Sequence, residues 1–360
     1  MAIDKIPGVY SRVDASAALK SLSANDYVIA IVAKGIDGDS ALINKAYAPT
    51  SFEDAQVKFG TDSNIVKIMD AAIENGGSKF IIVRVDDETV PATPNYTAAL
   101  DVVELEEAVD ILLTDSMNPT TFTTIKESVL SSSENRKERT AVVGFDVNTD
   151  IATVISATSG INSGRVITAY PNPLNESGTE VPGFITAAAI AGQLAKEQDP
   201  SMPMTGVEIQ GFYGLAKKLK DSEMESLIDA GVIPLESSNG AIRIVRCITT
   251  YTEDAQGNVD ITWQEVTTVR ISDYIMKDLR QDLARQFQRA KQTKDTRDAV
   301  RSRVLTKLIA YEELDYIENV GENDATIEIN PSNPLRNDVK FKYDVTGPMN
   351  VIHLTGYLVI

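Results

Sequence analysis

The sequence is poor in the residues on which much enzyme chemistry depends. Its 360 residues include one cysteine, one histidine and one tryptophan. A single cysteine excludes an intramolecular disulfide framework, and with a single histidine it excludes a cysteine–histidine zinc cluster. Cys247 lies in an apolar run, so we expect a small buried core residue. His353 would have to serve any serine or cysteine nucleophile, but it lies in a predicted strand and no matching motif points to it.

Motifs for phosphate binding are also missing. The chain has no Gly-x-x-x-x-Gly-Lys-Ser/Thr sequence, and no Gly-x-Gly-x-x-Gly follows a strand. Asn75-Gly76-Gly77 precedes a predicted strand, whereas a phosphate site at a helix needs its glycines before the helix. We therefore expect no cofactor and no catalytic residues, and the sequence favours a protein that is not an enzyme.

Basic residues are outnumbered. The chain has 34 Lys and Arg against 52 Asp and Glu, a formal net charge of −18. This argues against general binding to nucleic acid or to an anionic membrane surface. The longest uncharged apolar stretch, 184–195, is too short to span a bilayer. The first residues show no signal-peptide pattern, so we expect synthesis and folding in the cytosol.

What the sequence does contain, from residue 23 to 240, is an alternation of strands and helices. Continuous apolar runs predict buried strands at 27–33, 79–85, 109–113, 140–145 and 166–170. Single helical segments between them imply parallel strands joined by right-handed crossovers. The small-residue segment 186–196 predicts a helix that lies very close to a sheet. The sequence therefore predicts an α/β domain with a mainly parallel sheet.

The pattern changes between residues 241 and 346. An antiparallel pair is predicted at 242–251 and 264–270, followed by long helices at 272–291 and 296–318. Apolar residues recur at every fourth position of both helices, which predicts one buried stripe on each. Strands are predicted at 326–329 and 339–345. We interpret this region as a C-terminal α+β domain.

Both ends of the chain resemble short strands on flexible joints. Residues 1–22 form a predicted N-terminal arm, and 347–360 form a C-terminal arm whose apolar β sequence runs to the last residue. The backbone of such a strand needs a partner. The partner is either a sheet of its own domain or, through strand addition, a sheet of a neighbouring subunit.

Two aspartates keep an enzymatic alternative open. Asp115 and Asp146 both follow the carboxyl ends of predicted parallel strands, where open α/β sheets place their ligands. Together they could hold Mg²⁺. The structural interpretation is that each begins a loop or caps the following helix.

A basic segment stands out against the acidic whole. Residues 270–307 hold eleven Lys and Arg against five Asp and Glu. The basic residues of the first long helix flank its apolar stripe: Lys277, Arg280, Arg285, Arg289, Lys291 and Lys294. They form either the solvated back of the helix or a surface that docks on an acidic protein partner. Nucleic acid is the weaker candidate, because no aromatic residues are interleaved for base stacking.

Short motifs follow one another along most of the chain. They are Pro7-Gly8-Val9-Tyr10, Phe59-Gly60, Asn75-Gly76-Gly77 with the strand 80–85, Asn95-Tyr96 with Leu100, Arg136-Lys137-Glu138-Arg139, Tyr170-Pro171, and Val181-Pro182 with Ala191-Gly192. In this order they resemble the motifs of the contractile tail sheath proteins of phages and of phage-tail-like bacteriocins. The match is imperfect, because the terminal strand lacks the proline-rich ending of some sheaths.

The resemblance implies a structural subunit that polymerises helically around an inner tail tube, as a stack of sheath rings, and contracts to drive the tube through a cell envelope. Its partners would be further copies of itself, the tube protein, and baseplate and terminator proteins. It would assemble in the bacterial cytoplasm and belong to a virion tail or to a released tail-like particle.

The resemblance also assigns roles to residues. The arms would pair with a sheet in adjacent subunits through Ile6, Val9, Tyr10, Val13, Val351, Ile352, Leu354, Tyr357, Leu358 and Val359. The hinges would be Pro7, Gly8, Gly347 and Pro348. The C-terminal domain, with its six basic helix residues, would face the tube, and the α/β domain would face outward.

Overall fold

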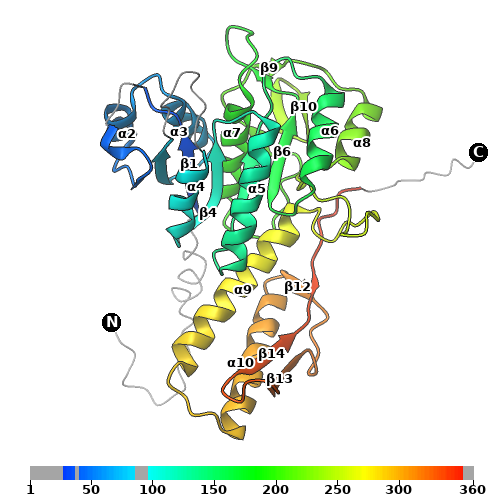
Figure 1. Ribbon diagram of the computed structural model, residues 1–360. Helices are drawn as coiled ribbons and strands as arrows, with labels where there is room; N and C mark the ends of the chain where they lie inside the picture. The colour runs from blue at the N-terminus through cyan, green and yellow to red at the C-terminus, as the bar shows by residue number, and fades with distance from the viewer. Residues whose placement is uncertain (1–26, 37–39, 86–95, 352–360) are drawn as a thin grey trace, which may run out of the picture.

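The computed structural model describes residues 27–36, 40–85 and 96–351. Figure 1 shows them as two lobes, an upper one built on a sheet and a lower one built on two helices. The helix α9 (Val266–Phe287) begins in the upper lobe and runs obliquely into the lower lobe, so it belongs to both.

The upper lobe, which we call the sheet domain, contains a nine-stranded sheet. Its six central strands are parallel, and the strands at the two sides are antiparallel to their neighbours. In spatial order they are β2 (Ala46–Tyr47), β3 (Lys79–Arg84), β1 (Val28–Ala33), β4 (Val109–Thr114), β5 (Thr140–Val143), β6 (Val166–Tyr170), β10 (Ile233–Ser238), β11 (Ala241–Ile244) and β8 (Glu208–Ile209). The mainly parallel α/β fold predicted from the sequence is confirmed.

Helices cover both faces of this sheet, which explains why its strands read as continuous apolar runs. Ile29 and Ile31 point to one face of β1, whereas Ala30 and Val32 point to the other. The first face carries α2 (Phe52–Phe59), α3 (Asn64–Glu74) and α7 (Gly183–Lys196); the second carries α4 (Tyr96–Leu105), α5 (Pro119–Glu134), α6 (Ile151–Ile161) and α8 (Asp221–Asp229). The remaining short elements are η1 (Ser40–Leu42), β7 (Pro173–Leu174) and β9 (Gly214–Leu215).

The small-residue helix α7 is buried and packs closely, as its sequence predicts. Its Gly192 lies against the end of α3, where an added Cβ would approach the Ala72 carbonyl oxygen to 2.4 Å. The helix α3 begins at a Ser63 side chain that accepts a hydrogen bond from the Val66 amide at 3.2 Å. It ends before Gly76, whose φ of 106° is a conformation that favours glycine.

The lower lobe consists of α9, α10 (Lys294–Glu312) and two small sheets. The apolar stripes of the two helices meet in a core that includes Ile275 and Leu279 of α9 and Leu308 and Tyr311 of α10. One two-stranded sheet pairs β12 (Ile317–Glu318) with β15 (Asp344–Val345), and the other pairs β13 (Ala325–Ile329) with β14 (Asn337–Phe341).

Two sequence predictions about this region are wrong in detail. Residues 266–270 form the start of α9 instead of a strand, and only a single bridge, Ile248 to Glu265, remains of the predicted pair. The β-branched sequence Val-Thr-Thr-Val suggested a strand, but packing of Val266 against the sheet core overrides that preference. The helix α10 also stops earlier than predicted, since Asp315 adopts a φ of 58° just beyond it.

Candidate assembly site

The helix α9 docks on the amino-terminal edge of the parallel strands through a row of ion pairs. Lys277 Nζ lies 2.6 Å from Asp110 Oδ1 in β4. Arg280 donates to both oxygens of Glu138, which lies two residues before β5, at 2.8 Å each. These contacts join residues more than 140 positions apart and hold the upper half of α9 against the sheet domain.

A third ion pair extends the row to β6. Asp273 Oδ1 accepts a hydrogen bond from Arg165 Nη2 at 2.7 Å. Burial raises the pKa of Asp273, and the neighbouring guanidinium opposes that shift. The Arg165 guanidinium thus partly offsets the cost of burying this carboxyl group.

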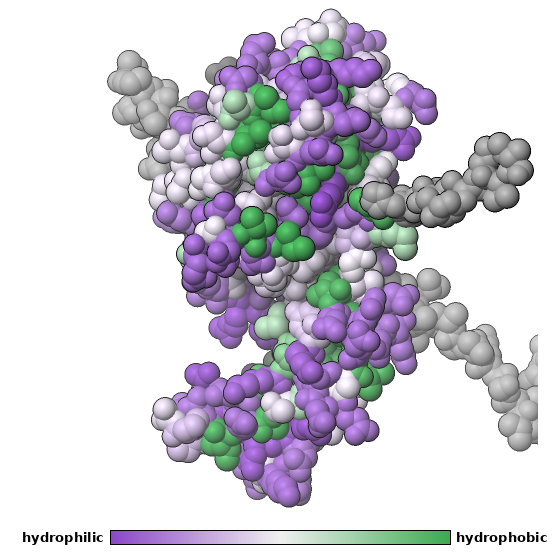
Figure 2. All heavy atoms as spheres, turned by 90° about the vertical axis from the view of Figure 1, so that its right-hand side faces the viewer, coloured by the Kyte–Doolittle hydropathy of each residue, from purple (hydrophilic) through white to green (hydrophobic). Residues whose placement is uncertain are grey.

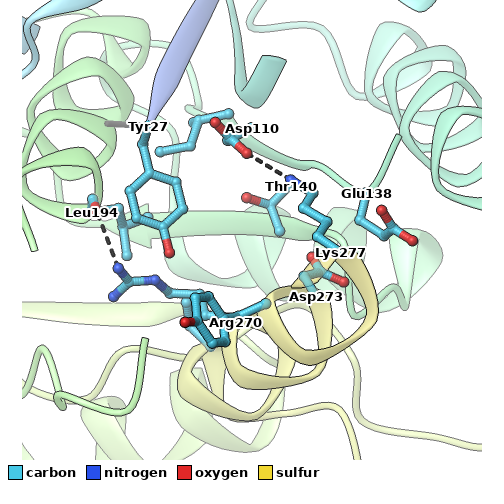
Figure 3. Close-up of a pocket in the computed structure, with 11 residues that line it drawn as sticks. Tyr27, Asp110, Glu138, Thr140, Leu194, Arg270, Asp273 and Lys277 are labelled. Carbon is cyan, nitrogen blue, oxygen red and sulfur yellow. Dashed lines mark hydrogen bonds and ion pairs between the residues drawn. The ribbon is translucent and has the colours of Figure 1, made fainter. Parts of the chain in front are cut away.

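Figure 3 shows the small cavity that this docking leaves, with a volume of about 50 Å³. Charged and aromatic side chains surround it: Tyr27, Asp110, Glu138, Arg270, Asp273 and Lys277. Apolar side chains of Ile111, Leu194 and Val266 complete the lining, and a space of this size suits one or two waters held by its polar groups. The acidic side of this contact was not predicted, although Glu138 lies in the charged run before β5 and Asp110 is a charge inside an apolar strand.

The six basic residues predicted to face a tube fall into two groups. Lys277 and Arg280 bind carboxylates of their own chain, so the structure gives them an intramolecular role. Arg285, Arg289, Lys291 and Lys294 are exposed, although Arg285 also lies 3.5 Å from Asp282. The prediction that all six lie on the first long helix is wrong, because α9 ends at Phe287: Arg289 and Lys291 lie in the connection to α10, and Lys294 begins α10. The exposed basic face is therefore smaller than the sequence suggested.

A second ion-pair network joins α9 to α10. Asp282 is 1% exposed and accepts hydrogen bonds from Arg303 Nε at 2.6 Å and Nη2 at 2.8 Å. The guanidinium lowers the pKa of Asp282 to about 2. Lys307 Nζ lies 2.8 Å from Asp278, whose carboxylate also accepts the Tyr311 hydroxyl. The pairing of the two helices thus depends on buried charge as well as on apolar packing.

The C-terminal segment crosses from the lower lobe to the sheet domain. After β15, the Thr346 amide donates to the Tyr316 carbonyl at 3.1 Å. Gly347 is exposed, Pro348 lines a second cavity, and Asn350 Nδ2 donates to Glu265 Oε1 at 3.0 Å. Val351 is exposed. The predicted hinge residues Gly347 and Pro348 therefore lie where the chain passes between the two lobes.

The other predicted arm and hinge residues lie outside the described part of the chain. They are Ile6, Pro7, Gly8, Val9, Tyr10, Val13, Ile352, Leu354, Tyr357, Leu358 and Val359. Their roles stay predictions.

Both small sheets of the lower lobe have open edges. Among the described residues, each consists of two strands, so each strand pairs on one side only. An isolated pair of strands is marginally stable in water. Apolar side chains are exposed nearby, with Ile329 43% and Leu335 88% accessible. Figure 2 shows this lobe as narrow and mainly hydrophilic, with apolar side chains between the polar ones.

The two aspartates of the metal alternative have separate structural roles. Asp115 is buried and accepts hydrogen bonds from the Lys34 amide at 3.2 Å, Asn64 Nδ2 at 2.8 Å and the Tyr96 hydroxyl at 2.7 Å. Asp146 is exposed and accepts its neighbour's amide at 2.8 Å. In the described ranges, no group of three or more His, Cys, Asp or Glu side chains is arranged to hold a metal ion.

Comparison with protein families identifies both halves of this architecture. The phage tail sheath protein central domain matches residues 89–250, and the phage tail sheath C-terminal domain matches residues 258–359. The chain belongs to the phage tail sheath family. Of the helices in the described part of this sheath-family chain, none is long and apolar enough to cross a bilayer.

Curated relatives of the sheath family are longer than this chain. The tail sheath protein of Bacillus phage SP01 is 30% identical over 234 residues, which cover 63% of this chain and 39% of the relative. The tail sheath protein of Mycobacterium phage Bxz1 is 27% identical over 250 residues, which cover 66% of this chain and 42% of the relative. The chain thus spans about two fifths of the length of these relatives.

Solved sheath structures share the fold over nearly the whole chain. The helical sheath of the anti-feeding prophage in its contracted state superposes with a TM-score of 0.72 at 16% identity, covering 98% of this chain and 99% of that one. The sheath tail protein of Listeria innocua gives a TM-score of 0.72 at 13% identity, covering 93% and 95%. At such identities the likeness establishes the fold alone.

Proposed function

We propose that this protein is the structural subunit of a contractile tail sheath, which polymerises helically around an inner tube and contracts to drive the tube through a cell envelope. Membership of the sheath family in both its central and C-terminal parts carries the proposal. The solved neighbours include a sheath in its contracted state and a baseplate, which are the assemblies this role requires.

In this proposal the particle is a phage tail or a related tail-like particle, assembled in the bacterial cytoplasm. The partners are further copies of the chain, an inner tube, a baseplate and a tail terminator. The chain divides at the proposed boundaries into an N-terminal arm (1–22), an outer α/β domain (23–240), a tube-facing domain (241–346) and a C-terminal arm (347–360).

The open edges of the lower lobe support strand addition by the arms. Each added strand supplies backbone hydrogen bonds worth about 0.5–1.5 kcal/mol each. Its buried Val, Ile or Leu side chains add about 1.5–3 kcal/mol each. An arm that makes several such hydrogen bonds and buries several such side chains holds its neighbour strongly enough to stay bound while subunits rotate.

The proposed tube contact is much weaker. It consists of the exposed basic residues Arg285, Arg289, Lys291 and Lys294. Exposed ion pairs contribute about 0–1 kcal/mol each and are screened by salt. A sheath held to its neighbours strongly and to its tube weakly can release the tube surface during contraction without coming apart.

The test is negative-stain electron microscopy of the purified chain and of a truncation after Val351. The truncation keeps the described contacts of Asn350, so we expect a folded monomer with an unchanged circular dichroism spectrum. Wild-type chains should form tubular polymers and the truncated chain should not. A variant with 352–360 replaced by Gly and Ser of equal length separates loss of apolar pairing from loss of length. Polymers of wild-type length from either variant would refute the arm assignment.

An enzyme with a metal at Asp115 and Asp146 is the alternative class. Both carboxylate oxygens of Asp115 accept hydrogen bonds from within the chain, which favours the structural role. Isothermal titration with Mg²⁺ and Mn²⁺ should show no saturable binding. A stoichiometric site lost in Asp115→Asn would support the alternative.

A further inference from the structure

The C-terminal segment contacts the rest of the molecule at Glu265, the N-cap residue of α9. Asn350 Nδ2 donates to Glu265 Oε1 at 3.0 Å, and Asn350 Oδ1 accepts from the Thr205 hydroxyl at 3.2 Å. Glu265 is the N-cap residue of α9 and is itself held by Arg246 Nε at 2.8 Å. The last described contact of the segment is therefore made with the N-cap residue of α9.

The N-terminal end of the described chain is attached five residues further along the same helix. The Arg270 guanidinium carbon lies 5.0 Å from the centre of the Tyr27 ring, and Figure 3 shows the two side chains facing each other. Tyr27 immediately precedes β1, the second central strand of the sheet. A cation over an aromatic ring at a desolvated site is a substantial attraction.

Arg270 is firmly placed for this contact. It is 8% exposed, and its Nη2 donates to the carbonyl oxygens of Leu194 and Glu197 at the end of α7. A guanidinium at the carboxyl end of a helix is favoured by the helix dipole. The two cavities beside α9, one lined by Tyr27 and the other by Pro348, share Val266 and Arg270 as walls.

We propose that the start of α9, from Glu265 to Arg270, couples the two ends of the chain, so that fixing one arm in a neighbouring subunit preorganises the other. This inference rests on the proposed sheath function. An arm that leaves the body from a fixed point loses less entropy on binding than one that leaves from a loose point. Because both contacts are made with the same short helical segment, loosening either one loosens the support of the other.

A double-mutant cycle on preformed polymers tests the coupling. Tyr27→Leu keeps the apolar contact of this side chain with the sheet core and removes the cation–aromatic contact. Asn350→Asp removes the donor to Glu265 and places a second carboxylate beside it. The readout is the rate at which polymers dissociate at a fixed urea concentration, followed by light scattering. Each single variant should dissociate about two- to tenfold faster, the range expected for one such contact.

Coupling predicts that the double variant dissociates no faster than the more severe single variant. Independent contacts at distant sites predict that the two factors multiply. Multiplication, or single variants that match wild type, would overturn the proposal. Thr205→Val, which removes the other hydrogen bond of Asn350 from an exposed position, should behave as Asn350→Asp does in the cycle.

Matched controls distinguish coupling from general weakening. Asn239→Asp makes the same charge change at an exposed turn of the sheet domain, between β10 and β11 and away from the open strand edges of the lower lobe. Tyr213→Leu makes the same aromatic change at a residue that is 67% exposed. Both should dissociate at the wild-type rate. If the wild-type chain forms no polymers, the proposed function fails and this inference fails with it, whereas additive variants in good polymers defeat the coupling alone.

Discussion

The two lobes are held together in different ways. In the sheet domain, fully buried strands lie between two layers of helices, and residues such as Leu113 and Ile167 are 0% exposed. In the lower lobe, one helix pair packs against two-stranded sheets with open edges, and buried charges such as Asp282 join the helices. In the described residues, the edges of the nine-stranded sheet are the two-residue strands β2 and β8, whereas every strand of the lower lobe has one unpaired edge.

The difference indicates that the two lobes have different roles in assembly. A domain with both faces of its sheet covered gains little from a neighbour. A lobe with marginal sheets gains backbone hydrogen bonds and apolar burial when another strand is added. We therefore expect the sheet domain to act as a rigid body and the lower lobe to become fully stable only in the polymer.

The largest expected effect comes from truncating one core side chain in each lobe and comparing which elements lose stability. Leu113→Ala and Leu308→Ala each delete a fully buried side chain, which costs about 2–5 kcal/mol in free energy of unfolding. The first loss should appear as earlier urea unfolding of the whole chain. The second should appear in the monomer as faster hydrogen exchange in α10 and β13, while β1 and β4 exchange at the wild-type rate.

Val57→Ala is the control for this pair, because Val57 is 80% exposed and its truncation should change stability little. If Leu308→Ala accelerated exchange in β1 as much as in α10, the lobes would form one cooperative unit. The proposed difference in stability between them would then be wrong.

A smaller effect follows from the charge network of the lower lobe. The pKa of Asp282 is about 2 in the folded chain and near 3.8 without its partners. A depressed carboxyl pKa stabilises the fold above about pH 4, and this stability is lost as pH falls towards 2. The contribution is about 2 kcal/mol, as expected for a shift of this size.

Hydrogen exchange of α10 relative to β1 between pH 5 and 2.5 checks the prediction, with each amide corrected for its intrinsic rate. Acid should open α10 first in the wild-type chain. In Asp282→Asn, α10 should be opened already at pH 5 and should respond less to acid. Asp298→Asn, which changes an exposed carboxylate of α10, should keep the wild-type profile. An identical acid response in wild type and Asp282→Asn would contradict the role of this pair.

Much of the fold was accessible from the sequence because its signals are local. The run 79–85 is apolar since its strand is covered on both faces, and the capping residues Ser63 and Asn75 mark the bounds of α3. The start of α9 was not accessible, because its β-branched residues favour a strand until the sheet core buries Val266. Tertiary packing, which no local pattern records, decided that element.

The site was predicted less completely than the fold. The basic residues of α9 and of its connection to α10 were recognised as a group, but a charge count cannot tell a partner in another protein from one in the same chain. Asp110 lies 167 positions before Lys277, and only the docking of α9 on the strand ends brings them together. The contact of Asn350 with Glu265 spans 85 positions and likewise carried no sequence signal.

The smallest expected effect concerns the ion pairs between the lobes. Lys277→Met removes the partner of Asp110, whose other oxygen still accepts the Val28 amide at 3.0 Å. The pair is partly exposed, so its loss should cost about 0.2–1 kcal/mol, and 0.5 M salt should weaken the wild-type contact in the same direction. Hydrogen exchange in the upper half of α9 measures both.

Lys291→Met makes the same change at an exposed position and should leave α9 exchange unaltered. A loss in Lys277→Met as large as that in Leu308→Ala would mean that charge, and not the apolar burial of Val266 in the sheet core, holds α9 on the sheet domain. The small value is expected because apolar burial at the N-terminal end of α9 already attaches the helix to the sheet domain. The ion pairs therefore set the orientation of the lobes more than the strength of their attachment.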